Sequence, residues 1–113
     1  MDLSSKQLAE IINVVEEKKG RDTVLLNLKG ISLVTDYFLI VTGNSTTQVK
    51  AIADNIEEKL PGLGLPILRI EGLPEARWVL VDCGDIVIHI MTPDTRDFYN
   101  LERLWGDAEV VSL

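Results

Sequence analysis

The pattern of apolar and polar positions is clearest in residues 77–91, where two strand-like runs flank a Gly-Asp pair at 84–85. Alternating runs joined by a two-residue turn that contains glycine are typical of a β-hairpin. The register set by this turn pairs Trp78 with Met91, and successive side chains along each run point to opposite faces. We therefore predict a hairpin with two different faces.

One face of the predicted hairpin is apolar throughout, as expected of a face that packs on a core. It carries Val79, Val81, Cys83, Ile86, Ile88 and Ile90. The other face combines large apolar side chains with a carboxylate and an imidazole. It carries Trp78, Leu80, Asp82, Val87, His89 and Met91. We expect this mixed face either to be half-covered by a helix or to be offered to a partner.

Apolar residues recur at helical spacing in three segments, and each is predicted to be a helix. These segments are residues 4–18, residues 46–60, and a last helix that starts near 94 or 95 and stops at Gly106. The first helix should begin at a capping box formed by Ser4 and Gln7. On the last helix, we expect Phe98, Leu101 and Trp105 to lie on one side.

Runs of β-branched and aliphatic residues predict further strands over 23–28, 37–42 and 66–71. Together with the hairpin, these elements predict an α/β fold: a mixed, about five-stranded sheet flanked by helices. Residues 107–113 are expected to form a short, mobile tail. The length suits one core, so residues 1–113 are assigned to a single domain.

Composition and charge narrow the class of protein. Hydrophobic residues make up 46% of the chain and charged residues 26%, as in ordinary globular proteins. No apolar run approaches the ~20 residues that span a bilayer, and the N-terminus is acidic where a signal peptide would be basic. We expect a cytoplasmic protein that does not contact membranes. The net charge of −7 favours a basic protein surface as the partner, with little direct nucleic-acid contact.

Cys83 and His89 are the only cysteine and the only histidine of the chain. One cysteine excludes an internal disulfide, and one of each cannot make a zinc site. Because Cys83 lies on the apolar face, a role as a small buried hydrophobe is favoured. For His89, a structural hydrogen bond to Asp82 or to a neighbouring strand is favoured. A pH switch that uses its titration near neutral pH stays open as a hypothesis.

An enzyme hypothesis also stays open. Gly43-Asn44-Ser45 lies between a strand and a helix, where backbone amides can bind a phosphate, although a turn in which Ser45 or Thr46 caps the helix is favoured. Asp82 and Asp85 are three positions apart across a turn, so they are poorly placed to share a metal ion. The alternative is a small nucleotidyltransferase-like enzyme that uses residues 43–45 for phosphate and Asp82 for metal.

Several motifs occur in order along nearly the whole chain. They are Thr35-Asp36-Tyr37-Phe38, Thr42-Gly43-Asn44-Ser45, Glu71-Gly72, Trp78 with Asp82, Gly84-Asp85, Val87-Ile88-His89, and the pattern R-x-F-Y-x-L-E-x-L-W from Arg96 to Trp105. In these motifs and their spacing the chain resembles the ribosomal silencing factor family, also called the Iojap family.

The resemblance implies a nucleotidyltransferase-like fold without the catalytic carboxylates, and neither enzyme activity nor a cofactor. It further implies binding to the large ribosomal subunit through ribosomal protein fourteen, at the surface that faces the small subunit. Such binding would sterically block subunit joining and repress translation under nutrient limitation.

The expected partner contacts combine this resemblance with the hairpin register. They are Trp78, Leu80, Asp82, His89 and Met91 on the mixed face and Tyr99 on the last helix. The resemblance supports the region of Trp78, an aromatic residue of the type that anchors interfaces, and the other contacts depend on the register. A homodimer would cover the mixed face when the protein is free.

Overall fold

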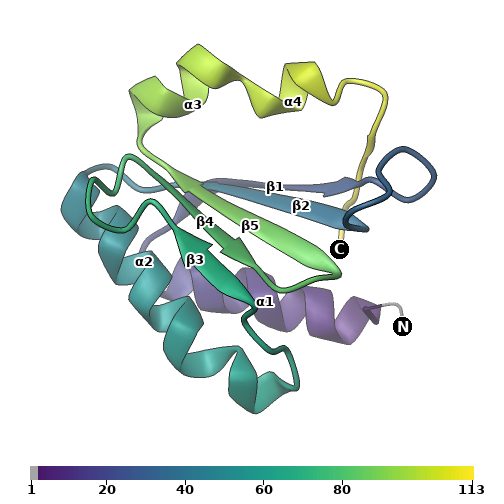
Figure 1. Ribbon diagram of the computed structural model, residues 1–113, viewed down its shortest axis with the longest axis horizontal. Helices are drawn as coiled ribbons and strands as arrows, with labels where there is room; N and C mark the ends of the chain where they lie inside the picture. The colour runs from purple at the N-terminus through teal and green to yellow at the C-terminus, as the bar shows by residue number, and fades with distance from the viewer. Residues whose placement is uncertain (1–2) are drawn as a thin grey trace.

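Within residues 3–113, which the computed structural model describes, six strands form one mixed sheet with helices on both of its faces (Figure 1). The elements in chain order are α1 (Ser5–Glu17), β1 (Arg21–Asn27), β2 (Tyr37–Thr42), α2 (Thr46–Lys59), the 3-10 helix η1 (Pro61–Leu63), β3 (Arg69–Glu71), β4 (Trp78–Asp82), β5 (Ile86–Met91), α3 (Pro93–Tyr99), α4 (Leu101–Leu104) and β6 (Glu109–Val110). The predicted α/β class is confirmed. No helix in this part of the chain is long and apolar enough to cross a membrane.

The strand order is β3-β4-β5-β2-β1-β6, with β2 and β5 parallel and every other neighbouring pair antiparallel. The predicted hairpin is confirmed residue by residue, including the pair Trp78 and Met91. Its turn is closed by a hydrogen bond from the backbone N–H of Cys83 to the carbonyl oxygen of Ile86, 2.9 Å long. Strand β5 lies between β4 and β2, inside the sheet, and its six residues are all buried.

Helices α1 and α2 cover the lower face of the sheet in Figure 1 and build the main core with it. The predicted capping box starts α1, because the N–H of Gln7 donates to Oγ of Ser4 over 3.1 Å while Ser4 N–H donates to Oε1 of Gln7. Oγ of Ser45 caps α2 in the same way, by accepting from the N–H of Gln48. The whole apolar face of the hairpin packs into this core.

The C-terminal tail is not a loose end. Strand β6 pairs with β1, matching Leu26 with Val110, and the N–H of Val111 donates to the carbonyl oxygen of Leu25 over 2.8 Å. The expectations of about five strands and a mobile tail are therefore corrected. Pairing of the tail satisfies backbone groups that would otherwise be exposed along the edge of β1.

The predicted last helix is in fact two helices, α3 and α4, which meet at Asn100. Asn100 has a left-handed backbone with φ of 46°, and its side-chain oxygen caps α4 by accepting from the N–H of Arg103. Leu101 is buried in a second, smaller core on the upper face of the sheet, and Trp105 packs against it. Phe98 is 82% exposed, so the prediction that it shares their side was wrong.

Gly72, in the loop before β4, has a backbone conformation that favours glycine. Its φ is +90°, and a Cβ added there would overlap the carbonyl oxygen of Trp78. We expect Gly72→Ala to lower the free energy of unfolding by about 2 kcal/mol or more, measured by urea denaturation. Gly62→Ala is the matched control, because a Cβ at Gly62 meets nothing within 4 Å. Equal stability of the two variants would contradict this explanation.

Candidate functional site

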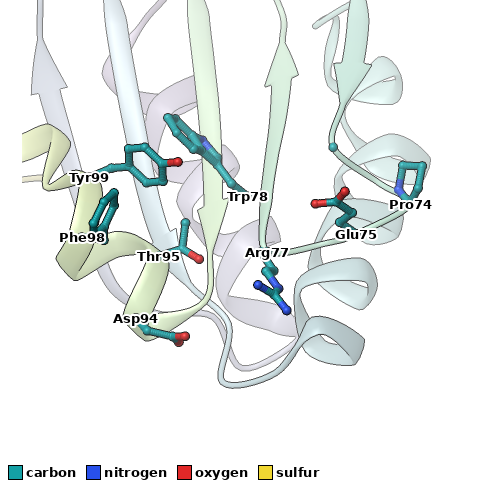
Figure 2. Close-up of a pocket in the computed structure, with 9 residues that line it drawn as sticks. Pro74, Glu75, Arg77, Trp78, Asp94, Thr95, Phe98 and Tyr99 are labelled. Carbon is teal, nitrogen blue, oxygen red and sulfur yellow. The ribbon is translucent and has the colours of Figure 1, made fainter.

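The upper face of the sheet is only partly covered, and a cleft of about 760 Å³ lies between α3 and the loop that joins β3 to β4 (Figure 2). We call this cleft the aromatic groove. Its lining residues are Gly72, Pro74, Glu75, Arg77, Trp78, Asp94, Thr95, Phe98 and Tyr99. One wall comes from α3 and the other from the loop, with the start of β4 between them.

Three aromatic side chains form a continuous surface in the groove. The ring centroids of Trp78 and Tyr99 are 4.8 Å apart, and those of Tyr99 and Phe98 are 5.0 Å apart. Tyr99 is 53% exposed and Phe98 82%, whereas Trp78 is half-buried against the smaller core. Large exposed aromatics beside one another are typical of sites that bind another macromolecule. The structure thus brings together Trp78 and Tyr99 as predicted, and it adds Phe98.

His89 and Met91 lie on the predicted face but are not accessible. Met91 is fully buried in the smaller core and His89 is 3% exposed. The expectation that these two side chains are offered to a partner is therefore corrected. They are covered because α3 and α4 shield the part of the sheet where β5 runs, leaving the part at β4 open.

The favoured structural hydrogen bond of His89 is confirmed, and its partner is Trp78 on the neighbouring strand β4 and not Asp82. The indole Nε1–H of Trp78 donates to Nδ1 of His89 over 3.0 Å. Burial lowers the pKa of His89 from 6.5 to about 4, so its imidazole is neutral between pH 6 and 8 and cannot switch charge there. Because Nδ1 accepts, the proton lies on Nε2, which has no hydrogen-bond partner.

Asp82 and Leu80 extend the upper face along β4, and both are half-buried. The carboxylate of Asp82 is already used within the protein. One oxygen accepts from the N–H of Gly84 over 2.8 Å, and the other lies 3.4 Å from Nε of Arg69. Asp82 therefore supports the hairpin turn and the edge strand β3. In residues 3–113 no group of three or more His, Cys, Asp or Glu side chains is arranged to hold a metal ion.

The polar groups of Asn44, in loop 43–45, are likewise hydrogen-bonded within the protein. The N–H of Asn44 donates to Oε1 of Gln48 over 2.6 Å, and the Asn44 side-chain oxygen accepts from Nε of Arg21. A phosphate would have to displace Gln48 from the Asn44 amide. The structure of loop 43–45 thus agrees with the favoured interpretation, a turn in which Ser45 caps α2.

A largely buried arginine, which the sequence pattern did not single out, holds the α3 wall in place. Arg96, with a side chain 10% exposed, donates from Nη1 to Oγ1 of Thr42 over 2.8 Å. Its Nε and Nη2 bond both carboxylate oxygens of Glu102 on α4, at 3.3 and 3.1 Å. This bidentate contact ties α3, α4 and the end of β2 together. Arg96 and Glu102 both belong to the C-terminal motif, which was the available signal.

Burial raises the pKa of the Cys83 thiol to about 11, and the negative charge of the neighbouring Asp82 adds to the effect. The thiol is 7% exposed and packs in the main core, as predicted for a small buried hydrophobe. It therefore has little thiolate character at neutral pH.

The fold and the site together define a small α/β protein with an open groove lined by aromatic side chains. The family model described as "Ribosomal silencing factor during starvation" matches residues 2–113. A ribosomal silencing factor of Halalkalibacterium halodurans is 48% identical over 112 residues, covering 98% of this chain and 96% of that protein. The chain belongs to the ribosomal silencing factor family.

Two further similarities extend the comparison. A crystal structure from Bacillus halodurans superposes with a TM-score of 0.85 at 45% identity, covering 97% of this chain and all of that one. The mouse protein named "Mitochondrial assembly of ribosomal large subunit protein 1" is 33% identical over 98 residues, which is 84% of this chain and 43% of that protein. The relation to nucleotidyltransferases, which the family resemblance implies, stays a prediction.

The lowered pKa of His89 predicts an acid-dependent loss of stability. Between about pH 6.5 and pH 4 the unfolded chain binds a proton at this residue that the folded chain excludes. The contribution of His89 is thus complete above pH 6.5 and is lost as the pH falls toward 4, by about 3 kcal/mol in total. Urea denaturation across this range should show a steeper loss for the wild type than for His89→Gln, which cannot be protonated. Parallel curves would contradict the prediction.

Proposed function

We propose that this chain binds the large ribosomal subunit through ribosomal protein fourteen and sterically prevents the small subunit from joining. The observation that carries the proposal is the aromatic groove, where exposed aromatic side chains lie beside one another without a covering element in the described part of the chain. Membership of the silencing factor family supports ribosome silencing as the function. The name of the mouse relative supports the large subunit as the target.

The charge of the chain supports a basic protein as the surface that is bound. The net charge is −7, and Glu75 and Asp94 stand on opposite walls of the groove. An acidic rim around an aromatic centre suits a partner that offers aliphatic stems and cationic ends. Arg77 lies on the same rim, so one carboxylate of the partner is also accommodated.

A steric mechanism requires only a rigid body in the right place. The chain measures 33 × 32 × 23 Å, and its sheet is packed by helices on both faces. A body of this size on the joining surface of the large subunit would hold the two subunits apart without any chemical reaction. Lower translation under nutrient limitation would follow from the number of large subunits so occupied.

The contacts that we propose are the predicted residues that reach the surface, with Phe98 added. Trp78 and Tyr99 form the centre together with Phe98, while Leu80 and Asp82 lie further along β4. The same aromatic surface would be buried against a second copy when no ribosome is available. Dimerisation would then compete with docking on the ribosome.

Phe98→Ala provides the sharpest test of this interface. Because Phe98 is 82% exposed, its truncation should leave stability nearly unchanged and yet weaken binding by about tenfold or more. Val34→Ala is a matched control, since Val34 is 84% exposed but does not line the groove. Affinity is measured by biolayer interferometry with purified large subunits and, separately, with purified ribosomal protein fourteen.

Each comparison in this experiment decides one part of the proposal. Equal affinity of Phe98→Ala and Val34→Ala for large subunits would reject the aromatic groove as the interface. Binding to large subunits without binding to ribosomal protein fourteen would reject that protein as the docking partner. We also expect the wild-type affinity to fall with rising salt, because charge attraction contributes to the encounter.

A further inference from the structure

The indole of Trp78 is held from below by a single hydrogen bond. In the hairpin register Trp78 is paired with Met91, so His89 is its diagonal neighbour on the same face. The Nε1–H of Trp78 reaches Nδ1 of His89 over 3.0 Å, and the two ring centroids are 5.9 Å apart. On its other side the indole meets Tyr99 in the aromatic groove. Trp78 therefore links a buried imidazole to the groove surface.

The acceptor itself has little freedom to move. His89 lies on β5, which is paired with β4 on one side and with β2 on the other. The ring of Phe38, from β2, contacts the imidazole with a centroid distance of 4.5 Å and an interplanar angle of 67°. Only 3% of the surface of His89 is exposed, so neighbouring side chains of the core hold the imidazole in place. It is a rigid support for a side chain that is only half-buried.

A residue needed only for packing at this position would be apolar. The Nε2–H of His89 is buried without a hydrogen-bond partner, which carries a free-energy cost that a phenylalanine would avoid. A phenylalanine could also make the ring contact with Phe38, whereas the hydrogen bond that Nδ1 accepts from Trp78 requires the imidazole. The low pKa keeps that nitrogen unprotonated, so the acceptor persists at neutral pH.

We propose that His89 is a positioning residue for the aromatic groove: it fixes the Trp78 indole in one orientation against Tyr99 and so preorganises the surface that binds the partner. The proposal rests on the proposed function for its consequence, although the positioning itself belongs to the free protein. A fixed indole loses less rotational freedom when the partner docks, and tighter binding follows without a new contact.

Nuclear magnetic resonance of the chain of residues 1–113 tests the positioning directly. In the wild type we expect the Nε2–H tautomer of His89, a hydrogen-bonded Trp78 indole N–H, and ring contacts between Trp78 and Tyr99. In His89→Phe the indole N–H signal should shift and exchange faster, and the contacts with Tyr99 should weaken. The Trp105 indole shares the ring contact of Phe38 with His89 but makes no hydrogen bond to it, so the exchange rate of the Trp105 N–H is the internal control and should not change. In His89→Gln an amide oxygen can accept, so part of the wild-type signal should return.

Binding to large subunits supplies the functional measurement. We expect His89→Phe to bind about fivefold more weakly than the wild type while being at least as stable at pH 7. In a Trp78→Phe background, which has no indole N–H, the same His89 substitution should cause no further loss. This cycle separates the loss of the hydrogen bond from general damage to the fold.

The outcomes distinguish this inference from the proposed function. Unchanged Trp78–Tyr99 contacts in His89→Phe, or unchanged affinity in that variant, would overturn the positioning role. Absence of wild-type binding to large subunits would instead reject the proposed function. In that case the resonance measurements would still decide whether His89 positions Trp78. Should His89→Phe fail to fold, His89→Leu, which also removes the acceptor, takes its place in both measurements.

Discussion

The register of the β4–β5 hairpin is the constraint on which the rest of the structure depends. Strand β5 is paired on both edges and buried on both faces, so each of its side chains has one permitted direction. A shift by one residue would exchange the faces and place the His89 imidazole in the apolar core between the sheet and helices α1 and α2. In the existing register the isoleucines of β5 pack into that core, and Trp78 lies at the open end of the upper face.

The groove exists because the upper face is covered incompletely. Helix α3 ends at Asn100, whose left-handed backbone redirects the chain into α4. Arg96 then fixes both helices to each other and to Thr42. Leu101 closes the part of the sheet near β5, while Phe98 and Tyr99 remain at the border of the uncovered part. The groove thus arises from a local helix break together with one partly buried ion pair.

Much of the fold could be predicted from local patterns in the sequence. Alternation and the Gly-Asp pair predicted the hairpin register, and the caps at Ser4 and Ser45 predicted where α1 and α2 begin. The break at Asn100 could not be predicted this way, because the apolar spacing on either side of it suits one continuous helix. Pairing of β6 with β1 also escaped prediction, since it joins two residues to a strand about 80 positions away.

The candidate site was predictable to a similar extent. Trp78 and Tyr99 share it as the sequence suggested, because the hairpin places one and the last helical motif places the other. His89 and Met91 were assigned to an exposed face, since alternation tells which side chains share a face but not which part of it a helix covers. The exposure of Phe98 depends on the same helix position and was missed for the same reason.

Together these features describe a packed α/β fold with one exposed aromatic surface, and we propose that it acts by occupying space on the large subunit. The most direct test of that account is a subunit-joining measurement on sucrose gradients, in which large subunits are saturated with the chain before small subunits are added. The account predicts that the chain migrates with free large subunits and that the peak of joined ribosomes falls as occupancy rises. Joined ribosomes that form in undiminished amount on large subunits carrying the chain would contradict it.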